Sequence, residues 1–288
     1  MILQREIAAM AQARNVAKLT IDKDWVLGHF LDAIYSIESL KDNLIFKGGT
    51  CLKKCYLPDY WFSEDLDFTC RDSNFELKRT HINHICKLVD QRAGILTHLE
   101  KFLPLEFENK PTGYQVIIKY WGADHKQSEA PPEPVRWLTS VKVEIITYEK
   151  LMLSFEEKQV VHDYTDSLSV ASNSIPCYSI AEMMSEKLRA LIQRSYSAPR
   201  DYYDIWMLSQ TFSALDYDTI VNTFLEKMKF KGLQFIGIEQ FLNAQTDKIV
   251  GTAWKNSLAH QIPNGKLPSY EKVKVDLMVL FGRMFPKI

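Results

Sequence analysis

The pattern of apolar residues changes from mixed to purely helical late in the chain, and this change limits the folds that the chain can adopt. Four short β-type runs occur in the first part, at 44–47, 66–69, 114–121 and 141–148, and residues 158–164 are a candidate for a further strand. From about residue 179 the pattern is helical to the end, and the first forty residues are helical as well. A polar, serine-rich stretch near 165–178 separates the two patterns. The sequence therefore predicts an α/β (α+β) chain, with a mixed first domain at 1–172 and an all-helical domain at 173–288.

Charge and the length of apolar runs restrict the class of protein further. The 288 residues include 35 Lys and Arg against 36 Asp and Glu, a net charge of −1, which excludes binding of polyanions by bulk charge. No run approaches the ~18 apolar residues of a membrane span, and the start of the chain lacks the apolar core of a signal peptide. We therefore expect a cytoplasmic protein without membrane association, whose five cysteines are reduced thiols.

A turn of two glycines precedes a strand with two carboxylates in residues 46–69. Gly48 and Gly49 lie between a strand and a helix, so the backbone can approach a ligand closely and the first N–H groups of the helix can bind phosphate. Asp65 and Asp67 share one face of the later strand, because side chains alternate along a strand. Adjacent carboxylates repel each other unless a cation lies between them, and hard oxygen ligands beside a phosphate suit Mg²⁺.

Glu144 is the one acid in an otherwise apolar strand, residues 141–147 (VKVEIIT). A buried carboxylate is costly without a partner or a metal ion. A neighbouring strand would bring Glu144 beside Asp65 and Asp67, and the three carboxylates would form a two-metal site. The alternative is an ion pair between Glu144 and Lys142 on a half-exposed strand.

The start of the helical portion, residues 179–206, carries a third informative pattern. Ser179 and Glu182 have the spacing of a capping box that opens a helix. Lys187 lies on one face of this helix together with Arg194, so that a basic stripe could meet a triphosphate. Asp201 and Asp204 follow at i, i+3 in the next helix.

These segments together resemble one family. GGTCLKK (48–54), FSEDLDF (62–68), EKLRALIQR (186–194) and PRDYYDIW (199–206) are similar to the nucleotidyltransferase toxins of the AbiEii/AbiGii abortive-infection family, whose relatives include the MenT toxins of type IV toxin–antitoxin systems. The resemblance is close over 44–69 and 179–208, loose over the β-rich middle and uninformative for the last 70 residues. It implies a polymerase-β-like nucleotidyltransferase core with a mixed sheet, followed by a helical domain.

The resemblance also implies roles for single residues. The expected nucleotide-binding residues are Gly48, Gly49, Thr50, Lys54, Ser63 and Lys187; the expected catalytic residues are Asp65, Asp67, Lys187 and Asp204; and the expected Mg²⁺ or Mn²⁺ ligands are Asp65 and Asp67, to which the strand argument adds Glu144. The chain departs from the family at Trp61, where many relatives carry an arginine. The implied reaction moves a nucleotide from an NTP to RNA, in relatives the 3′ end of tRNA, and blocks translation. The implied partners are therefore an NTP, an RNA and a cognate antitoxin.

Other interpretations of the same residues stay open. Asp65 and Asp67 also fit the nucleophile loop of haloacid-dehalogenase-type phosphatases, although that loop leaves the glycine turn unexplained. The acids could also be purely structural, in a non-catalytic module that binds a nucleotide or a protein partner. Lys187, Arg189 and Arg194 could form an ordinary solvated helix face that pairs with Glu182 and Glu186.

Two further groups are interpreted as structural. Cys51 and Cys55 lie one helical turn apart beside the glycine turn, and we expect them to be packing residues. Lys227, Lys229 and Lys231 form a second basic cluster, which we expect to be solvated.

Overall fold

The computed structural model describes residues 2–126, 128–169, 174–194, 198–262 and 265–286. The chain divides into two units. We call Met1–Glu149 with Phe155–Cys177 the sheet unit, and Lys150–Ser154 with Tyr178–Ile288 the helical unit. The domain boundary predicted between 172 and 173 lies outside the described residues. The strand at residues 175–177 belongs to the sheet unit, because it pairs with the first strand. The sheet unit therefore extends past the predicted boundary.

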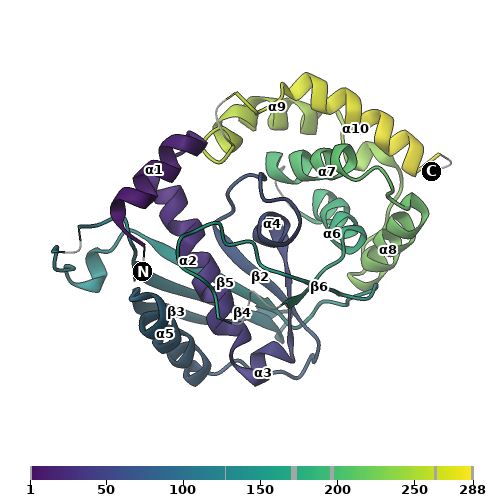
Figure 1. Ribbon diagram of the computed structural model, residues 1–288. Coiled ribbons are helices and arrows are strands. Elements are labelled where there is room, and N and C mark those ends of the chain that lie inside the picture. Colours follow the sequence, from purple (N-terminus) through teal and green to yellow (C-terminus); the bar gives the residue numbers. More distant parts are fainter. Residues whose placement is uncertain (1, 127, 170–173, 195–197, 263–264, 287–288) are drawn as a thin grey trace. The chain divides into compact units, whose positions relative to one another are not determined.

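The sheet unit contains a mixed sheet of seven strands in the order β3-β4-β5-β2-β1-β7-β6 (Figure 1). The strands are β1 Leu44–Lys47, β2 Asp65–Cys70, β3 Leu96–Phe107, β4 Lys110–Trp121, β5 Ser140–Ile146, β6 Glu156–Lys158 and β7 Ile175–Cys177. The pairs β1–β7 and β2–β5 are parallel, and the other described pairs are antiparallel. The predicted mixed sheet is therefore confirmed.

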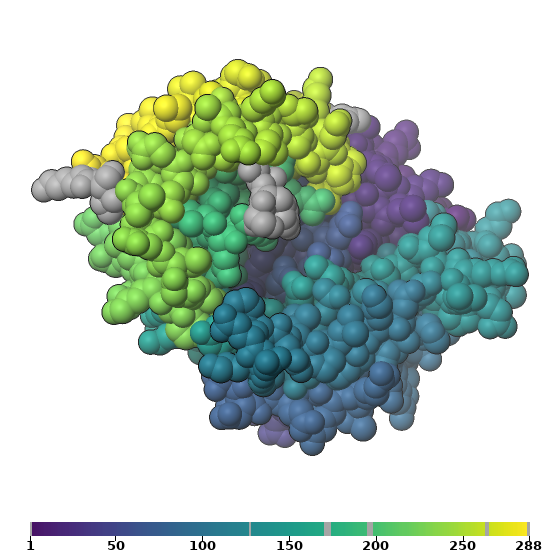
Figure 2. Space-filling view, turned by 180° about the vertical axis from the view of Figure 1, so that it is seen from behind, coloured from purple at the N-terminus to yellow at the C-terminus, as the bar shows by residue number. Residues whose placement is uncertain are grey.

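Helices of the sheet unit precede β1 and lie between its strands. They are α1 Gln4–Arg14, α2 Lys18–Tyr35, α3 Glu38–Lys41, α4 Gly48–Cys51, which continues as a π-helix over Leu52–Tyr56, and α5 Arg79–Ala93; a 3₁₀ turn spans Pro134–Arg136. The loop that joins β4 to β5 and contains this turn projects from the sheet unit in both views (Figures 1 and 2).

One face of the sheet is the core of this unit. Leu66 and Phe68 of β2, and Val143 and Ile145 of β5, are buried. Helix α2 crosses this face (Figure 1), and its Tyr35 ring lies 6.2 Å from that of Phe68. Since side chains alternate along a strand, the residues between these apolar ones point to the opposite face.

Two β-type features differ from the sequence prediction. The long strand β3 is not among the four predicted runs. The run at 158–164 was predicted as a strand, yet only β6, Glu156–Lys158, pairs with the sheet. Beyond it the Val161 N–H donates to the Lys54 carbonyl, 2.7 Å away, so the chain leaves the sheet edge.

The helical unit consists of α6 Ile180–Gln193, α7 Pro199–Thr211, α8 Tyr217–Phe230, α9 Ala244–Leu258 and α10 Tyr270–Met284, with a 3₁₀ turn at Ile238–Gln240. Its core includes a cluster of phenylalanine rings from α8, α10 and the segments that follow each of them. The predicted all-helical second part is therefore confirmed. None of the helices in the described parts of the chain combines the length and apolar character needed to cross a membrane.

The start of α6 contains a buried ion pair that the sequence did not reveal. Ser179 caps the helix by accepting the Glu182 N–H at 3.2 Å, which is one half of the predicted capping box. The Glu182 carboxylate, however, lies 2.6 Å from the Lys227 ammonium, and both side chains are fully buried. The prediction that Lys227 is solvated was therefore wrong: buried charges need partners, and Lys227 has Glu182.

Candidate active site

Three carboxylates meet on the face of the sheet opposite to α2. Strands β2 and β5 pair in parallel, with Asp67 opposite Glu144 and Asp65 opposite Lys142. Paired residues of neighbouring strands point to the same side. The predicted approach of Glu144 to the two aspartates is thus confirmed, and so is the alternative contact, since the Lys142 Nζ lies 3.8 Å from Glu144 Oε2.

The charges of this acidic cluster, Asp65, Asp67 and Glu144, are incompletely balanced. Burial, and then the carboxylates of Glu144 and Asp65, raise the pKa of Asp67 to about 6, although Lys47 and Lys142 act in the opposite direction. Lys142 Nζ lies 3.2 Å from Asp65 Oδ2. Among the described residues, the three carboxylates do not form a group whose ligand atoms all lie within 4.8 Å. The Lys142 ammonium lies between two of them, where positive charge is favoured.

The glycine turn lies directly against the acidic cluster. Gly48 has φ +78°, and a Cβ placed there would lie 2.3 Å from Asp67 Oδ2. A Cβ on Gly49 would meet the Trp61 ring at 3.0 Å and Ser63 Oγ at 3.1 Å. Gly48 therefore needs glycine for close approach and for its backbone conformation, whereas a Cβ at Gly49 would require a small shift of Trp61 and Ser63.

Thr50 fixes the turn to the acidic strand. Its hydroxyl is buried and donates to the Asp65 carbonyl at 2.5 Å. The backbone from Gly48 to Thr50 is thus held beside the carboxylates of β2. The order of the motifs predicted this neighbourhood, and Lys47 was among the basic residues expected near it. Lys47 is opposite Asp67 in register. The prediction missed Gln115, whose Nε2 donates to Glu144 Oε1 at 3.3 Å.

Lys54, which was expected to bind a phosphate, pairs with an aspartate of α2 instead. Its ammonium lies 2.8 Å from Asp24 Oδ2, and both residues are buried. The Tyr164 hydroxyl also donates to Asp24 Oδ2, at 2.7 Å. In this structure Lys54 therefore belongs to a buried ion pair, because a charge removed from water requires an opposite charge.

Lys187 and Asp204 meet within the helical unit. The Lys187 ammonium forms an ion pair with Asp204 and lies 3.5 Å from Asp201 Oδ1. Burial alone would lower the pKa of Lys187, but Asp204 and Asp201 outweigh it and raise this pKa. Arg194 pairs with Asp201 as well. Lys187 and Arg194 therefore pair with acids of α7, and not with Glu182 and Glu186 as in the alternative of a solvated helix face. Arg189, the other basic residue of that alternative, donates to Gln193.

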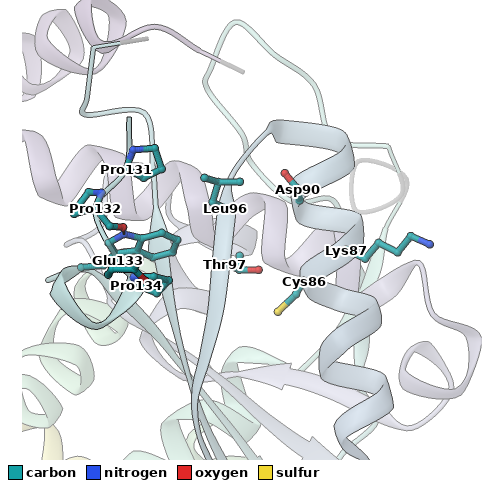
Figure 3. A pocket seen from close by; sticks show the side chains of 10 residues that line it. Cys86, Lys87, Asp90, Leu96, Thr97, Pro131, Pro132, Glu133 and Pro134 are labelled. Carbon is teal, nitrogen blue, oxygen red and sulfur yellow. Dashed lines mark hydrogen bonds between the residues drawn. The ribbon is translucent and has the colours of Figure 1, made fainter. Parts of the chain in front are cut away.

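A separate hollow of about 570 Å³ lies elsewhere in the sheet unit (Figure 3). It is bounded by Pro131, Pro132 and Pro134 on one side and by Cys86 and Lys87 of α5 on the other. None of the residues predicted for catalysis or nucleotide binding lines it.

Comparison with known proteins agrees with this geometry. A glycine turn held against paired carboxylates on a mixed sheet is what the family resemblance implies for a nucleotidyltransferase. The family model described as nucleotidyl transferase AbiEii toxin, type IV toxin–antitoxin system, matches residues 29–274. The chain therefore belongs to the AbiEii family of nucleotidyltransferase toxins. This membership removes the haloacid-dehalogenase alternative.

Solved structures show the same fold. MenT4, a nucleotidyltransferase toxin from Mycobacterium tuberculosis, is similar with a TM-score of 0.69 and 19% identity, over 100% of this chain and 91% of that one. JHP933 from Helicobacter pylori is similar with a TM-score of 0.55 and 14% identity, over 94% of both chains. Among curated protein sequences, none matches the chain significantly.

Proposed function

We propose that this toxin transfers a nucleotide from an NTP to an RNA acceptor, with the 3′ end of tRNA as the expected acceptor, and thereby blocks translation. The observation that carries this proposal is the contact between turn and acids: a Cβ on Gly48 would lie 2.3 Å from Asp67 Oδ2. Phosphates bound by the turn would thus lie beside the carboxylates. A cognate antitoxin is the partner that family membership implies.

The acidic cluster fits a divalent cation. Its donors are hard oxygens, as Mg²⁺ or Mn²⁺ prefers. The raised pKa of Asp67, about 6, reflects excess negative charge that a cation would neutralise. We propose Asp65, Asp67 and Glu144 as the ligands. A bound divalent cation supplies charge neutralisation at the phosphates and a lowered pKa of the attacking hydroxyl.

We propose that the remaining site residues bind and orient the nucleotide. The amides of Gly48, Gly49 and Thr50 would donate to phosphate oxygens, and the Thr50 bond to Asp65 keeps them in register with the acids. Ser63 lies beside Gly49 and would add a hydroxyl donor. In the helical unit Lys187 would contact the nucleotide, with its ammonium oriented by Asp204.

The experiment is a transfer assay with Mg²⁺, each labelled NTP in turn, and total tRNA. We expect label on RNA with the wild-type chain and none with Asp67→Asn. Asp90→Asn is the matched control, because it makes the same change at an exposed position of α5. Release of phosphate from small phosphoesters without RNA labelling, or no activity toward any of these substrates, would overturn the proposal. The second result would favour a non-catalytic module.

A further inference from the structure

Three thiols lie close together at the helix that follows the glycine turn. Cys51 ends α4, Cys55 lies in the π-helix that continues it, and Cys177 ends β7. Their sulfur atoms all lie within 4.8 Å of one another, and Cys51 and Cys177 are fully buried. Two cysteines one turn apart would need no explanation beyond packing. A third thiol that comes from a distant strand to the same point is a different arrangement.

From this geometry we propose that Cys51, Cys55 and Cys177 form a binding site for a thiophilic d¹⁰ cation, Zn²⁺ being the expected one. Zinc–sulfur bonds of about 2.3 Å in a tetrahedral site place the sulfurs about 3.8 Å apart. Sulfurs that already lie within 4.8 Å need only a small contraction to reach this spacing. The soft thiolates also separate this site from the hard oxygen cluster, which selects Mg²⁺.

One basic residue lies close enough to act on the thiols. Three thiolates and one divalent cation carry a net charge of −1, and the charge of Lys158 acts on Cys177 and Cys55. Its ammonium also pairs with Glu156 Oε2 at 2.8 Å, so it would offset the negative charge of the site only in part. The Tyr56 hydroxyl lies 3.6 Å from Cys177 Sγ, so a fourth position can be taken by this oxygen or by water.

A metal ion binds the thiolate and not the thiol, so binding here would release the protons of the three thiols. Since Cys51 directly follows Thr50, an ion here would join the start of the turn helix to β7. The proposal of this metal site is independent of the transfer reaction, and it stands even if the toxin acts on a substrate other than RNA.

The test uses the full chain, reduced, stripped with a chelator and kept in excess Mg²⁺ so that hard oxygen sites are filled. Co²⁺ is then added in steps. We expect one equivalent to bind, with the thiolate-to-cobalt charge-transfer band and the strong visible bands of a tetrahedral complex. Zn²⁺ should then displace the cobalt. Absence of the charge-transfer band, or the weak spectrum of an octahedral oxygen site, would overturn the proposal.

Variants assign the signal to these thiols. Cys55→Ser changes a half-buried position and should weaken Co²⁺ binding by more than about tenfold. Cys86→Ser changes a half-buried thiol of α5 and should leave binding as in the wild type. As a second measurement on the wild-type chain, Zn²⁺ should protect the half-buried Cys55 from alkylation while the half-buried Cys86 reacts at an unchanged rate. Equal bands in wild type and Cys55→Ser, or equal labelling of Cys55 with and without Zn²⁺, would mean that the thiols only pack.

Discussion

Asp67 is the residue at which stability and activity oppose each other most directly. Burial and the neighbouring carboxylates raise its pKa from 3.8 to about 6, so its ionised form destabilises the cation-free protein at neutral pH. We expect Asp67→Asn to abolish nucleotide transfer and, with a chelator present, to raise the free energy of unfolding by about 1–3 kcal/mol. Urea denaturation and the transfer assay measure the two effects.

Mg²⁺ provides the control for this prediction. A ligand that binds only the native state stabilises it, so Mg²⁺ should raise the melting temperature of the wild type and of Asp90→Asn, but not of Asp67→Asn. An equal rise in all three proteins would place the cation elsewhere. A less stable Asp67→Asn would show that the carboxylate contributes net favourable contacts.

A second residue, Asp22, makes stability depend on pH. It is buried and accepts the N–H groups of Ala123 and Asp124, at 2.7 and 3.2 Å. Burial nevertheless raises its pKa from 3.8 to about 6. Between these values the native state binds the proton more strongly than the unfolded chain does, so the contribution of Asp22 is full below pH 3.8 and is lost as the pH rises through about 6.

Asp22→Asn removes this titration while it keeps an acceptor oxygen. Relative to the variant, the wild type should lose up to about 2–3 kcal/mol of unfolding free energy between about pH 4 and pH 7. Urea denaturation of both proteins across this range measures the difference, and other titrating groups cancel in it. A difference that is constant or grows with pH would contradict the assignment.

The sequence could predict the position of a residue only where its partners follow from the local pattern. Asp65, Asp67 and Glu144 were predictable because alternation along a strand fixes the face of each side chain. Lys54 was not, because its partner, Asp24, comes from another helix and nothing in the local pattern marks it as buried. The same holds for Cys177, which only the pairing of β7 with β1 brings to Cys51.

At the scale of elements, the turn between β1 and α4 is the most constrained connection in the site. Gly48→Ala would combine a strained φ of +78° with a Cβ 2.3 Å from Asp67 Oδ2. We expect it to lower the free energy of unfolding by more than about 1 kcal/mol and to abolish transfer, because the carboxylate must move. The transfer assay and urea denaturation test this.

Gly282→Ala is the matched control. Gly282 lies in α10, and a Cβ there would meet nothing within 4 Å. Alanine favours the helix over glycine, so this variant should be unchanged or more stable, by up to about 1 kcal/mol, with normal transfer. If both variants behave alike, the close approach of Gly48 to Asp67 has no functional meaning.

The elements themselves were predicted unevenly, for physical reasons. β1, β2 and β5 lie in the interior of the sheet, and their apolar runs predict them as strands. β3 is an edge strand whose residues are half-buried or exposed, so it lacks such a run. Residues 158–164 have β-type composition, but an N–H group there donates to the Lys54 carbonyl instead of a strand.

At the scale of the whole molecule, the chain passes between the two units three times. Lys150–Ser154 belongs to the helical unit, although Phe155–Cys177 returns to the sheet unit. This short segment supports the buried ion pair of α6 and α8. The Glu182 carboxylate accepts the N–H groups of Met152 and Leu153, at 3.1 and 2.8 Å, and Lys227 Nζ donates to the Lys150 carbonyl at 3.1 Å. No periodicity in the sequence could have assigned these five residues to the helical unit.

The helical unit should therefore need residues 150–154 to be stable. A fragment that begins at Tyr178 leaves two buried charges without three hydrogen-bond partners, and such bonds to charged groups contribute about 1.5–3 kcal/mol each. We expect it to be at least about 3 kcal/mol less stable to urea than a fragment in which residues 150–154 are joined to Tyr178 by a glycine-serine linker. Replacing Met152 and Leu153 of the linked fragment by proline removes both N–H donors and should return the lower stability. Equal stability of the fragments with and without 150–154 would show that water satisfies Glu182 and Lys227 at no cost, and that the segment only connects the two units.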